Sequence, residues 1–175
     1  MKGTSTEIKI VLVGEERVGK TNIISRMTDN QFEYSYQYTQ GPVVQEKIMT
    51  LEEFSDVFEV KIWDTSGNQK FRSLNKMFYK SASIVLIVFN ITDRKTYEEA
   101  INYWIQKMKN TDLVCLVANY CDIDEAYAVS INELKKFGDE NHVQIYMVSA
   151  QKNIGIQEML KDIITKYADF HYRKD

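Results

Sequence analysis

The sequence has little of what marks disulfide-rich, fibrous or nucleic-acid-binding proteins. Its 175 residues include one proline, seven glycines and two cysteines, and its net charge at pH 7 is −3. So few glycines and prolines exclude a collagen-like or low-complexity chain, and two cysteines cannot form a disulfide framework. Because a basic face is the usual footprint of nucleic-acid binding, we expect no nucleic-acid partner.

Long apolar stretches are also missing. Residues 1–6 contain no apolar signal region, and no apolar run approaches the roughly 20 residues needed to span a bilayer. We therefore expect a cytoplasmic chain that reaches intracellular membranes only if it is lipidated or recruited. With 44% hydrophobic residues among 175, the chain is long enough for one core, and we expect a single domain over residues 1–175.

What the sequence does contain is an alternation of apolar and amphipathic segments. Apolar residues at helical spacing predict helices around residues 97–108 and 156–170. Residues 51–56 suit a hairpin turn, and Pro42, which lacks an N–H, belongs at the beginning or edge of a strand. The pattern favours an α/β domain with one mostly parallel sheet wrapped by helices. Short apolar runs predict strands at residues 8–13, 43–49, 57–63, 83–89, 113–118 and 143–148.

The most informative motif lies in residues 14–21, which read G-x-x-x-x-G-K-T. A chance match in an ordinary loop is the alternative, but the predicted strand before it and the helical pattern after it are the context that a phosphate-binding loop requires. In such a loop the glycines let backbone N–H groups turn toward phosphates, and the helix N-terminus adds positive potential. Lys20 would supply a mobile charge and Thr21 a hydroxyl for a magnesium ion. The motif therefore predicts nucleotide binding.

Two further segments supply candidate metal and phosphate contacts. Asp64 ends a predicted strand within W-D-T-S-G, where its carboxylate can reach magnesium through water and the Gly67 N–H can face the γ-phosphate. Thr39 lies in a loop eighteen residues after Thr21, at a distance that suits a flap closing over the metal. These positions predict that Thr21, Thr39 and Asp64 share one magnesium site.

Two more segments indicate which base is bound. Asn119 and Asp122 form N-x-x-D after the strand predicted at 113–118, and the Asp122 carboxylate can accept hydrogen bonds from guanine N1–H and the 2-amino group. Adenine lacks that donor pair and would leave a buried carboxylate without partners. Ser149, Ala150 and Gln151 follow the last strand and can offer a backbone N–H to guanine O6. Taken in this order, the motifs predict binding of GTP or GDP with magnesium.

With these motifs in place, the chain resembles the small Ras-like GTPases, and within them most closely the Rab family. The resemblance covers nearly the whole chain. It implies a three-layer P-loop NTPase G domain, with a six-stranded mostly parallel sheet, one antiparallel edge strand and helices on both faces. It also implies a monomeric switch in vesicle trafficking with an exchange factor, an activating protein and effectors. The Rab-like stretches are DNQF at 29–32, VKIWDT at 60–65, KFRSL at 70–74, FYKSA at 78–82 and FNITD at 89–93.

The resemblance also implies roles for individual residues. Phe32 would pack edge-on against the guanine, Thr39 would belong to the first switch, and residues 67–79 would form the second. Catalysis would involve Lys20, Thr39, Gly67 and Asn68. Val44, Trp63 and Phe78 occupy the effector-contacting positions, where Rabs carry three aromatics; plain packing is the alternative role for the two aromatics here. The nucleotide-contacting positions are Glu16, Arg17, Val18, Gly19, Lys20, Thr21, Asn22, Phe32, Gly67, Asn119, Tyr120, Asp122, Ser149, Ala150 and Gln151.

Three residues depart from the family pattern. Asn68 stands where the family has its water-orienting glutamine, and its side chain is one methylene too short to reach an in-line water; an error of about 1 Å can cost roughly a hundredfold in rate. Glu16 occupies a P-loop position usually held by a small residue; we expect it to point outward and obstruct an incoming arginine finger. Tyr120 replaces the lysine of N-K-x-D, so it can cover the base but cannot reproduce the ammonium contact with the P-loop. These departures predict a low intrinsic rate of GTP hydrolysis.

The last residues, 171–175, lack the prenylated cysteines with which Rabs end, so we expect no lipid anchor in the chain as given. A truncated chain, a further domain and an unprenylated native protein all remain compatible with this ending. Three functional hypotheses follow: a Rab-like guanine-nucleotide switch, a hydrolysis-deficient nucleotide-binding scaffold, and a P-loop kinase. The kinase would need a lid and an acceptor site, and the sequence has no candidate for either.

Overall fold

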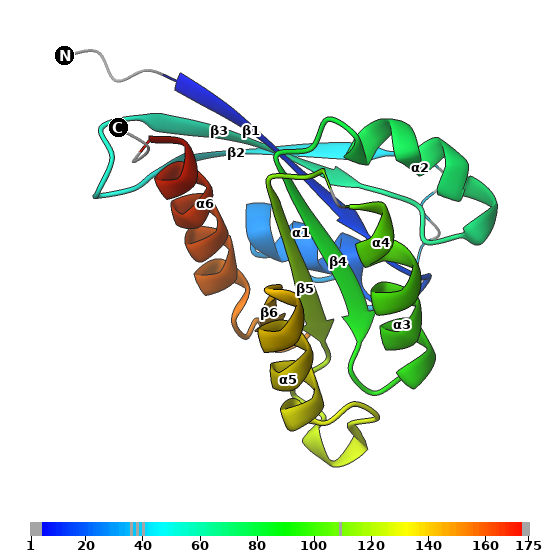
Figure 1. Cartoon of the computed structure of the whole chain (residues 1–175). Helices are drawn as coiled ribbons and strands as arrows, with labels where there is room; N and C mark the ends of the chain where they lie inside the picture. Colours follow the sequence, from blue (N-terminus) through cyan, green and yellow to red (C-terminus); the bar gives the residue numbers. More distant parts are fainter. Residues whose placement is uncertain (1–4, 36, 38, 40, 109, 173–175) are drawn as a thin grey trace.

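A single six-stranded sheet forms the centre of the molecule in the computed structural model, which describes residues 5–35, 37, 39, 41–108 and 110–172. Five strands are parallel, and β2 pairs antiparallel with β3 at one edge (Figure 1). The order across the sheet is β2-β3-β1-β4-β5-β6. The strands are β1 (Ser5–Val13), β2 (Val43–Thr50), β3 (Val57–Asp64), β4 (Ile84–Asn90), β5 (Leu113–Asn119) and β6 (Gln144–Met147).

Helices cover both faces of this sheet (Figure 1). The stripe predicted at 97–108 runs through α3, η2 and α4, where one π-helical turn interrupts the α-helix. The second predicted helix is α6, which carries its apolar stripe over seventeen residues. The helical elements are α1 (Lys20–Thr28), η1 (Gln69–Phe71), α2 (Arg72–Tyr79), α3 (Arg94–Glu99), η2 (Ala100–Trp104), α4 (Ile105–Lys107), η3 (Asp124–Ala126), α5 (Ile131–Asn141) and α6 (Ile156–Tyr172).

The hydrophobic core consists of two clusters, one on each face of the sheet. Successive residues of a strand point to opposite faces, so Ile10 and Leu12 of β1 pack with α1 and α6, while Val11 and Val13 pack with α2, α3 and α5. Cys115, at the centre of β5, is fully buried, and burial raises the pKa of its thiol to about 12. The α/β class, the three layers and the antiparallel edge strand are therefore as predicted.

The sheet topology brings the candidate site residues to one edge. Because β1, β3, β4 and β5 are parallel, their carboxyl ends meet there, and Asp64 and Asn119 are the last residues of β3 and β5.

Pro42 directly precedes the edge strand β2, and residues 51–56 connect β2 to β3 as an antiparallel hairpin, as predicted. None of the helices in the described ranges is long and apolar enough to cross a membrane.

Candidate nucleotide-binding site

The loop between β1 and α1 has the backbone conformation of a phosphate cradle. Gly19 has a φ of +93°, and a Cβ atom added there would lie 2.2 Å from the side-chain nitrogen of Asn119, so only glycine fits. Arg17 takes the left-handed conformation with a φ of +61°. Val18 is buried, whereas Glu16 and Arg17 are exposed. Glu16 is thus open to solvent, and it also lines the hollow described below, so the outward direction expected from phosphate repulsion stays a prediction.

Lys20 lies across the mouth of this loop. Its side-chain nitrogen donates hydrogen bonds to the carbonyl oxygens of Gly14 (3.0 Å) and Glu15 (2.7 Å). The residue is only 6% exposed, and burial lowers the pKa of its ammonium group to about 8, with Asp64 and Glu15 opposing the shift. An anion bound beside it would raise this pKa again, because an opposite charge within a few ångströms favours the charged form of an amine.

The three predicted metal ligands converge on one point. The Thr21 hydroxyl donates to Asp64 Oδ2 at 2.6 Å, and the Thr39 hydroxyl lies 3.4 Å from that of Thr21 and 3.5 Å from Asp64 Oδ2. Burial raises the pKa of Asp64, and its second carboxylate oxygen, Oδ1, is buried and has no hydrogen-bond partner in the part of the chain that the structure describes. A buried unpartnered oxygen is costly unless something binds it. Hydroxyl and carboxylate oxygens are the donors that Mg²⁺ prefers, so these residues fit that ion.

Asn119 connects the phosphate loop to the segment that would bind the base. Its side-chain nitrogen donates to the carbonyl oxygen of Val18 (2.9 Å), and its side-chain oxygen accepts the N–H of Ala150 (3.1 Å). Asp122, three residues further on, has a buried carboxylate oxygen, Oδ1, that has no hydrogen-bond partner among the described residues. Ser149 and Ala150 are buried, and Gln151 is exposed.

Tyr120 contacts the P-loop through a group that the sequence analysis did not consider. It brings no ammonium group, but its hydroxyl donates to the carbonyl oxygen of Arg17 at 3.2 Å. The residue has a φ of +67°, which turns the ring across the end of the P-loop. The brace is thus present as a neutral hydrogen bond.

A hollow of about 470 Å³ brings together the P-loop, Thr39, Gly67 and Tyr120, whereas its lining does not include Asp64, Asn119, Asp122 or residues 149–151. Asn22 lines it and also fixes its rim, because its amide accepts the N–H of Glu33 (2.8 Å) and donates to the Glu33 carbonyl (3.0 Å). Phe32 lines the same hollow and makes an edge-on contact with Tyr34, with ring centroids 4.9 Å apart. The hollow is also lined by Glu16, Arg17, Gly19, Lys20, Thr21, Glu33, Ser35, Gln37, Thr39, Thr65, Gly67 and Tyr120.

The segment after Gly67 is packed tightly against the P-loop. A Cβ atom added to Gly67 would lie 2.5 Å from the backbone nitrogen of Glu16, so glycine is required there. Asn68 uses its side-chain oxygen to accept the N–H of Lys70 (2.9 Å), which caps the turn η1. Gln69, the next amide, donates to Glu15 Oε2 at 3.3 Å. Both amides near the predicted water position are therefore engaged in protein contacts.

Comparison with known protein sequences identifies the family of this chain. A model of the Ras family matches residues 9–169. The chain belongs to the Ras family. It is 28% identical over 156 residues to the Ras-related protein RabZ of Dictyostelium discoideum, covering 85% of this chain and 66% of that protein. It is 28% identical to the Ras-related protein Rab-1 of Theileria parva, covering 95% and 80%, and 30% identical to the Ras-related protein RABA1b of Arabidopsis thaliana, covering 90% and 74%.

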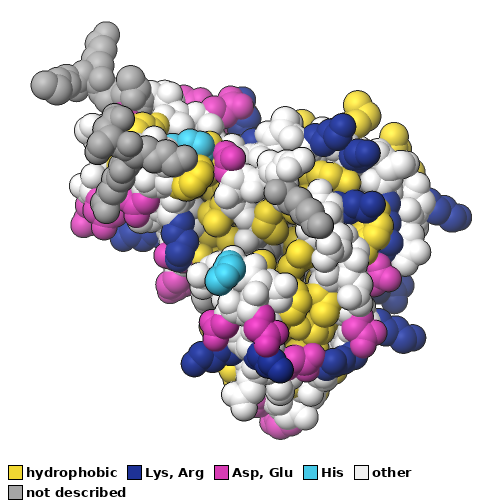
Figure 2. All heavy atoms as spheres, viewed as in Figure 1, with side chains coloured by type: hydrophobic (Ala, Val, Ile, Leu, Met, Phe, Trp, Pro, Cys, Tyr) yellow, Lys and Arg dark blue, Asp and Glu magenta, His cyan; other side chains and the backbone are white. Residues whose placement is uncertain are grey.

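Within the Ras family this chain is a divergent Rab-like GTPase, a small nucleotide switch related to proteins of trafficking. The family binds GTP or GDP with magnesium. The two aromatics at the Rab effector positions lie together, because Trp63 stacks on Phe78 with ring centroids 5.4 Å apart. Val44 pairs with Trp63 across β2 and β3 and is 39% exposed. Leu74 and Met77 of α2 are also exposed. Figure 2 shows hydrophobic and basic side chains next to one another on the surface over α2.

Sequence reasoning missed one residue that joins two parts of this Ras-family site. Arg26 of α1 donates to the carbonyl oxygens of Ala150 (2.8 Å) and Gln151 (3.3 Å), and its guanidinium lies 5.5 Å from the Phe32 ring centroid. It therefore ties the helix that carries Lys20 to the base-binding segment. No motif marks it, since an arginine in the last turn of a helix is ordinary.

Proposed function

We propose that the protein is a Rab-like guanine-nucleotide switch that binds GTP and GDP with magnesium and hydrolyses GTP slowly. The observation that carries this proposal is the pair of buried carboxylate oxygens without partners, Asp64 Oδ1 and Asp122 Oδ1. One belongs to the cluster of candidate magnesium ligands and the other follows Asn119, which connects the phosphate and base segments. A guanine nucleotide with its metal would provide partners for both.

Different residues would bind the phosphates, the base and the metal. Lys20 and the backbone N–H groups of the loop that ends at Gly19 would neutralise phosphate charge, and Asp122 and the Ala150 N–H would recognise guanine. Thr21, Thr39 and Asp64 would hold magnesium, which would supply positive charge to offset the negative charge of the phosphates. The Gly67 N–H is the candidate contact for the γ-phosphate.

Slow turnover is supported by the positions of two amides. Asn68 caps η1 through its side-chain oxygen and Gln69 donates to Glu15 through its side-chain nitrogen, so one end of each amide is held by a protein contact that opposes turning the side chain toward a water. The remaining groups stabilise charge but do not align a nucleophile. We expect a single-turnover rate at or below that of Ras alone, on the order of 10⁻⁴ s⁻¹.

The second candidate is a nucleotide-binding scaffold with negligible hydrolysis. It is supported by the same two amides and by Glu16. This glutamate lines both the nucleotide hollow and a groove beside it that is also lined by Asn68 and Glu99, and so it stands where an arginine finger would enter. In either case we propose a monomer with one domain over residues 1–175. An exchange factor and effectors acting in vesicle trafficking, with an activating protein for the switch, complete the proposal.

The test begins with the nucleotide that co-purifies with the protein. We expect GDP or GTP at close to one equivalent, with magnesium, and no adenine nucleotide. Lys20→Ala should lose this nucleotide, whereas Lys152→Ala, an exposed lysine next to the base segment, should retain it. Single-turnover hydrolysis then separates a slow switch from a scaffold that leaves GTP intact. Retention of nucleotide by the Lys20 variant would overturn the P-loop assignment.

A further inference from the structure

Arg26 of α1 binds carbonyl oxygens from two segments that lie far apart in the sequence. Its Nε donates to the carbonyl oxygen of Ala150 (2.8 Å), and its Nη2 donates to that of Gln151 (3.3 Å). Its Nη1 donates to the carbonyl oxygen of Asn30 (2.9 Å), two residues before Phe32. One partly buried side chain therefore connects the segment that follows α1 to the segment that follows β6.

The charge of Arg26 faces these carbonyl oxygens rather than a carboxylate. None of the ion pairs formed by the described residues includes Arg26. Hydrogen bonds from a charged donor are about twice as strong as those between neutral groups. The donors of a guanidinium lie in a fixed planar fork, an arrangement that the amine of a lysine on its flexible stem does not reproduce. The side chain is therefore suited to holding two backbone segments together.

The segment that follows β6 is also held by contacts that do not involve α1. The backbone groups of Ser149 and Ile154 pair in both directions, at 3.0 and 2.9 Å. The Ser149 hydroxyl accepts the N–H of Lys152 (3.0 Å), and the N–H of Ala150 donates to the side chain of Asn119 (3.1 Å). This segment therefore gives Arg26 a fixed point of attachment.

The segment that carries Phe32 depends more on single side chains. It turns at Asn30, which has a φ of +58° and whose side chain accepts a hydrogen bond from Asn153 (2.8 Å). Asn22 of α1 holds the other end through two hydrogen bonds with the backbone of Glu33, at 2.8 and 3.0 Å. Phe32 lies between these two points and lines the hollow. Its ring also lies 5.5 Å from the guanidinium carbon that binds the Asn30 side of the segment.

We propose that Arg26 is a positioning residue that keeps Phe32 against the bound base and thereby slows release of the nucleotide. This inference rests on the proposed function, since it requires a bound guanine nucleotide. A base that packs against the Phe32 ring is released when the segment that carries the ring moves away from residues 149–151. That movement breaks the hydrogen bonds of Arg26, so it becomes less frequent. Arg26 does not itself line the hollow, and it acts through Phe32.

Release of a fluorescent GDP analogue from the full chain, with magnesium present, tests the inference. Arg26→Gln removes the charge and the fork, and release should accelerate by about tenfold or more, as expected for losing a hydrogen bond from a charged donor. Arg26→Lys keeps the charge without the fork, so release should accelerate by a smaller factor. An unchanged release rate in Arg26→Gln would overturn the proposal.

A double-mutant cycle with Phe32→Leu separates positioning from general destabilisation. Phe32→Leu should itself accelerate release, because the ring against the base is lost. If Arg26 acts through that ring, the double variant should release nucleotide no more than about threefold faster than the faster single variant, since residues in contact are not additive. A larger increase would mean that the two residues act independently, and it would overturn the proposal. So would an unchanged rate in Phe32→Leu.

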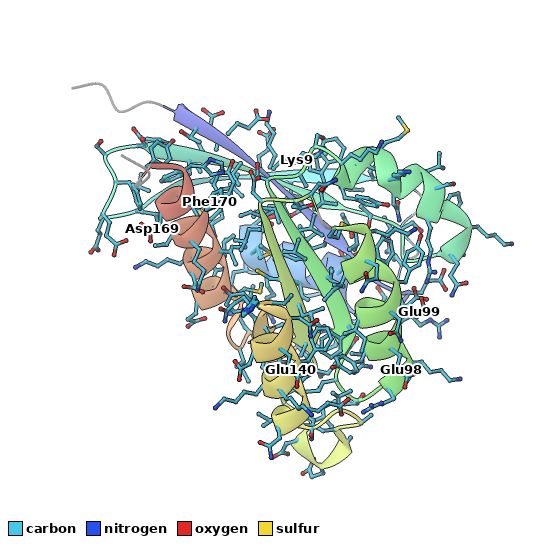
Figure 3. The ribbon with its side chains drawn as sticks, in the orientation of Figure 1. Lys9, Glu98, Glu99, Glu140, Asp169 and Phe170 are labelled. Carbon is cyan, nitrogen blue, oxygen red and sulfur yellow. The ribbon has the colours of Figure 1, made fainter. Side chains whose placement is uncertain are left out.

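Arg94→Gln is the matched control. Arg94 begins α3, contacts Glu98 of the same helix (Figure 3) and also contacts Glu133, so the variant removes a guanidinium that makes several hydrogen bonds. It does not line the hollow, and α3 packs on the face of the sheet opposite α1. Release from Arg94→Gln should match the parent protein within about twofold, because exposed ion pairs contribute little. Equal acceleration in Arg94→Gln and Arg26→Gln would contradict a specific role for Arg26.

Two further arms keep the outcome decisive. If Arg26→Gln does not fold, Arg26→Lys takes its place, and a release rate equal to that of the parent protein would overturn the proposal. If the parent protein binds no guanine nucleotide, the proposed function fails, and hydrogen–deuterium exchange of the free protein tests the anchor. The amides of residues 29–33 should then exchange about tenfold faster in Arg26→Gln than in Arg94→Gln, with exchange of β4 unchanged. Equal exchange in these two variants would show that Arg26 does not hold the segment.

Discussion

The hydroxyl of Tyr120 donates a hydrogen bond to the carbonyl oxygen of Arg17, 3.2 Å away, and so joins the base-binding segment to the phosphate loop. In the family a lysine stands at this position. A neutral hydrogen bond contributes about 1 kcal/mol and one to a charged group about 1.5–3 kcal/mol, so this brace is the weaker of the two. This contact between Tyr120 and the P-loop therefore carries no charge and is little affected by salt.

Removing the hydroxyl should loosen the nucleotide. Tyr120→Phe keeps the ring over the base but breaks the contact with Arg17, and release of a fluorescent GDP analogue should accelerate by about fivefold. Tyr146→Phe is the control, because that tyrosine loses a hydrogen bond to Asp162, away from the hollow. Equal release rates in Tyr120→Phe and the parent protein would show that the hydroxyl does not brace the site.

The base specificity depends on Asp122. Asp122→Asn should weaken guanine binding and favour xanthine, because xanthine presents an acceptor where guanine has its 2-amino group. We expect the preference between the two bases to shift by about a hundredfold, as for other sites in which a buried polar group is left unpaired. Competition between fluorescent and unlabelled nucleotides measures this, with the exposed Asp124→Asn as control. Equal binding of adenine and guanine by the parent protein would contradict the assignment.

Turnover should respond to the length of the amide at position 68. Asn68→Gln extends the side chain by one methylene and ends its capping of η1, so the single-turnover rate should rise modestly, by about two- to tenfold. Glu16→Gly is the companion variant, which should leave the intrinsic rate unchanged while opening the site to an activating protein's arginine. The intrinsic effects of the two substitutions should not be synergistic. A parent rate well above 10⁻⁴ s⁻¹, or no gain from Asn68→Gln, would mean that another group orients the water.

Nucleotide binding should take up protons in a defined pH window. In the free protein burial lowers the pKa of Lys20 to about 8, so its charged form is disfavoured and is lost as the pH rises through that value. Bound phosphates stabilise the charged form and raise the pKa, so binding at pH 8 should take up about half a proton, and little at pH 6.5. Calorimetry in buffers of different ionisation enthalpy measures the uptake. Lys20→Arg, which stays charged, should show none.

The sequence predicted the parts of this site that depend on local pattern and strand order. Lys20, Thr21, Asp64 and Asn119 follow directly from motifs at the ends of parallel strands, and a parallel sheet brings such ends together whatever the details of packing. The same reasoning located β2 through Pro42 and the hairpin. These features need only the period of the side chains and the direction of the strands.

The features of the site that the sequence did not predict depend on backbone conformation or on contacts between residues far apart in the chain. Arg72 and Glu15 are separated by 57 positions, and their contact requires α2 and the P-loop to be placed first. Tyr120 contacts Arg17 from a left-handed backbone conformation, and the N-x-x-D motif does not predict that conformation. The capping role of Asn68 requires the turn η1, and a comparison with glutamine by side-chain length alone could not reveal it.

Asn119 has a consequence for how quickly a ligand can be captured. Because one buried side chain is hydrogen-bonded to both Val18 and Ala150, the spacing between the P-loop and the segment after the last strand is set when the chain folds. An arriving nucleotide does not have to draw these two segments together, so little ordering of them accompanies its binding. Pyrophosphate and guanosine offered separately should each find a preformed half-site, and a covalent link between them should strengthen binding far beyond either fragment, as effective concentration predicts.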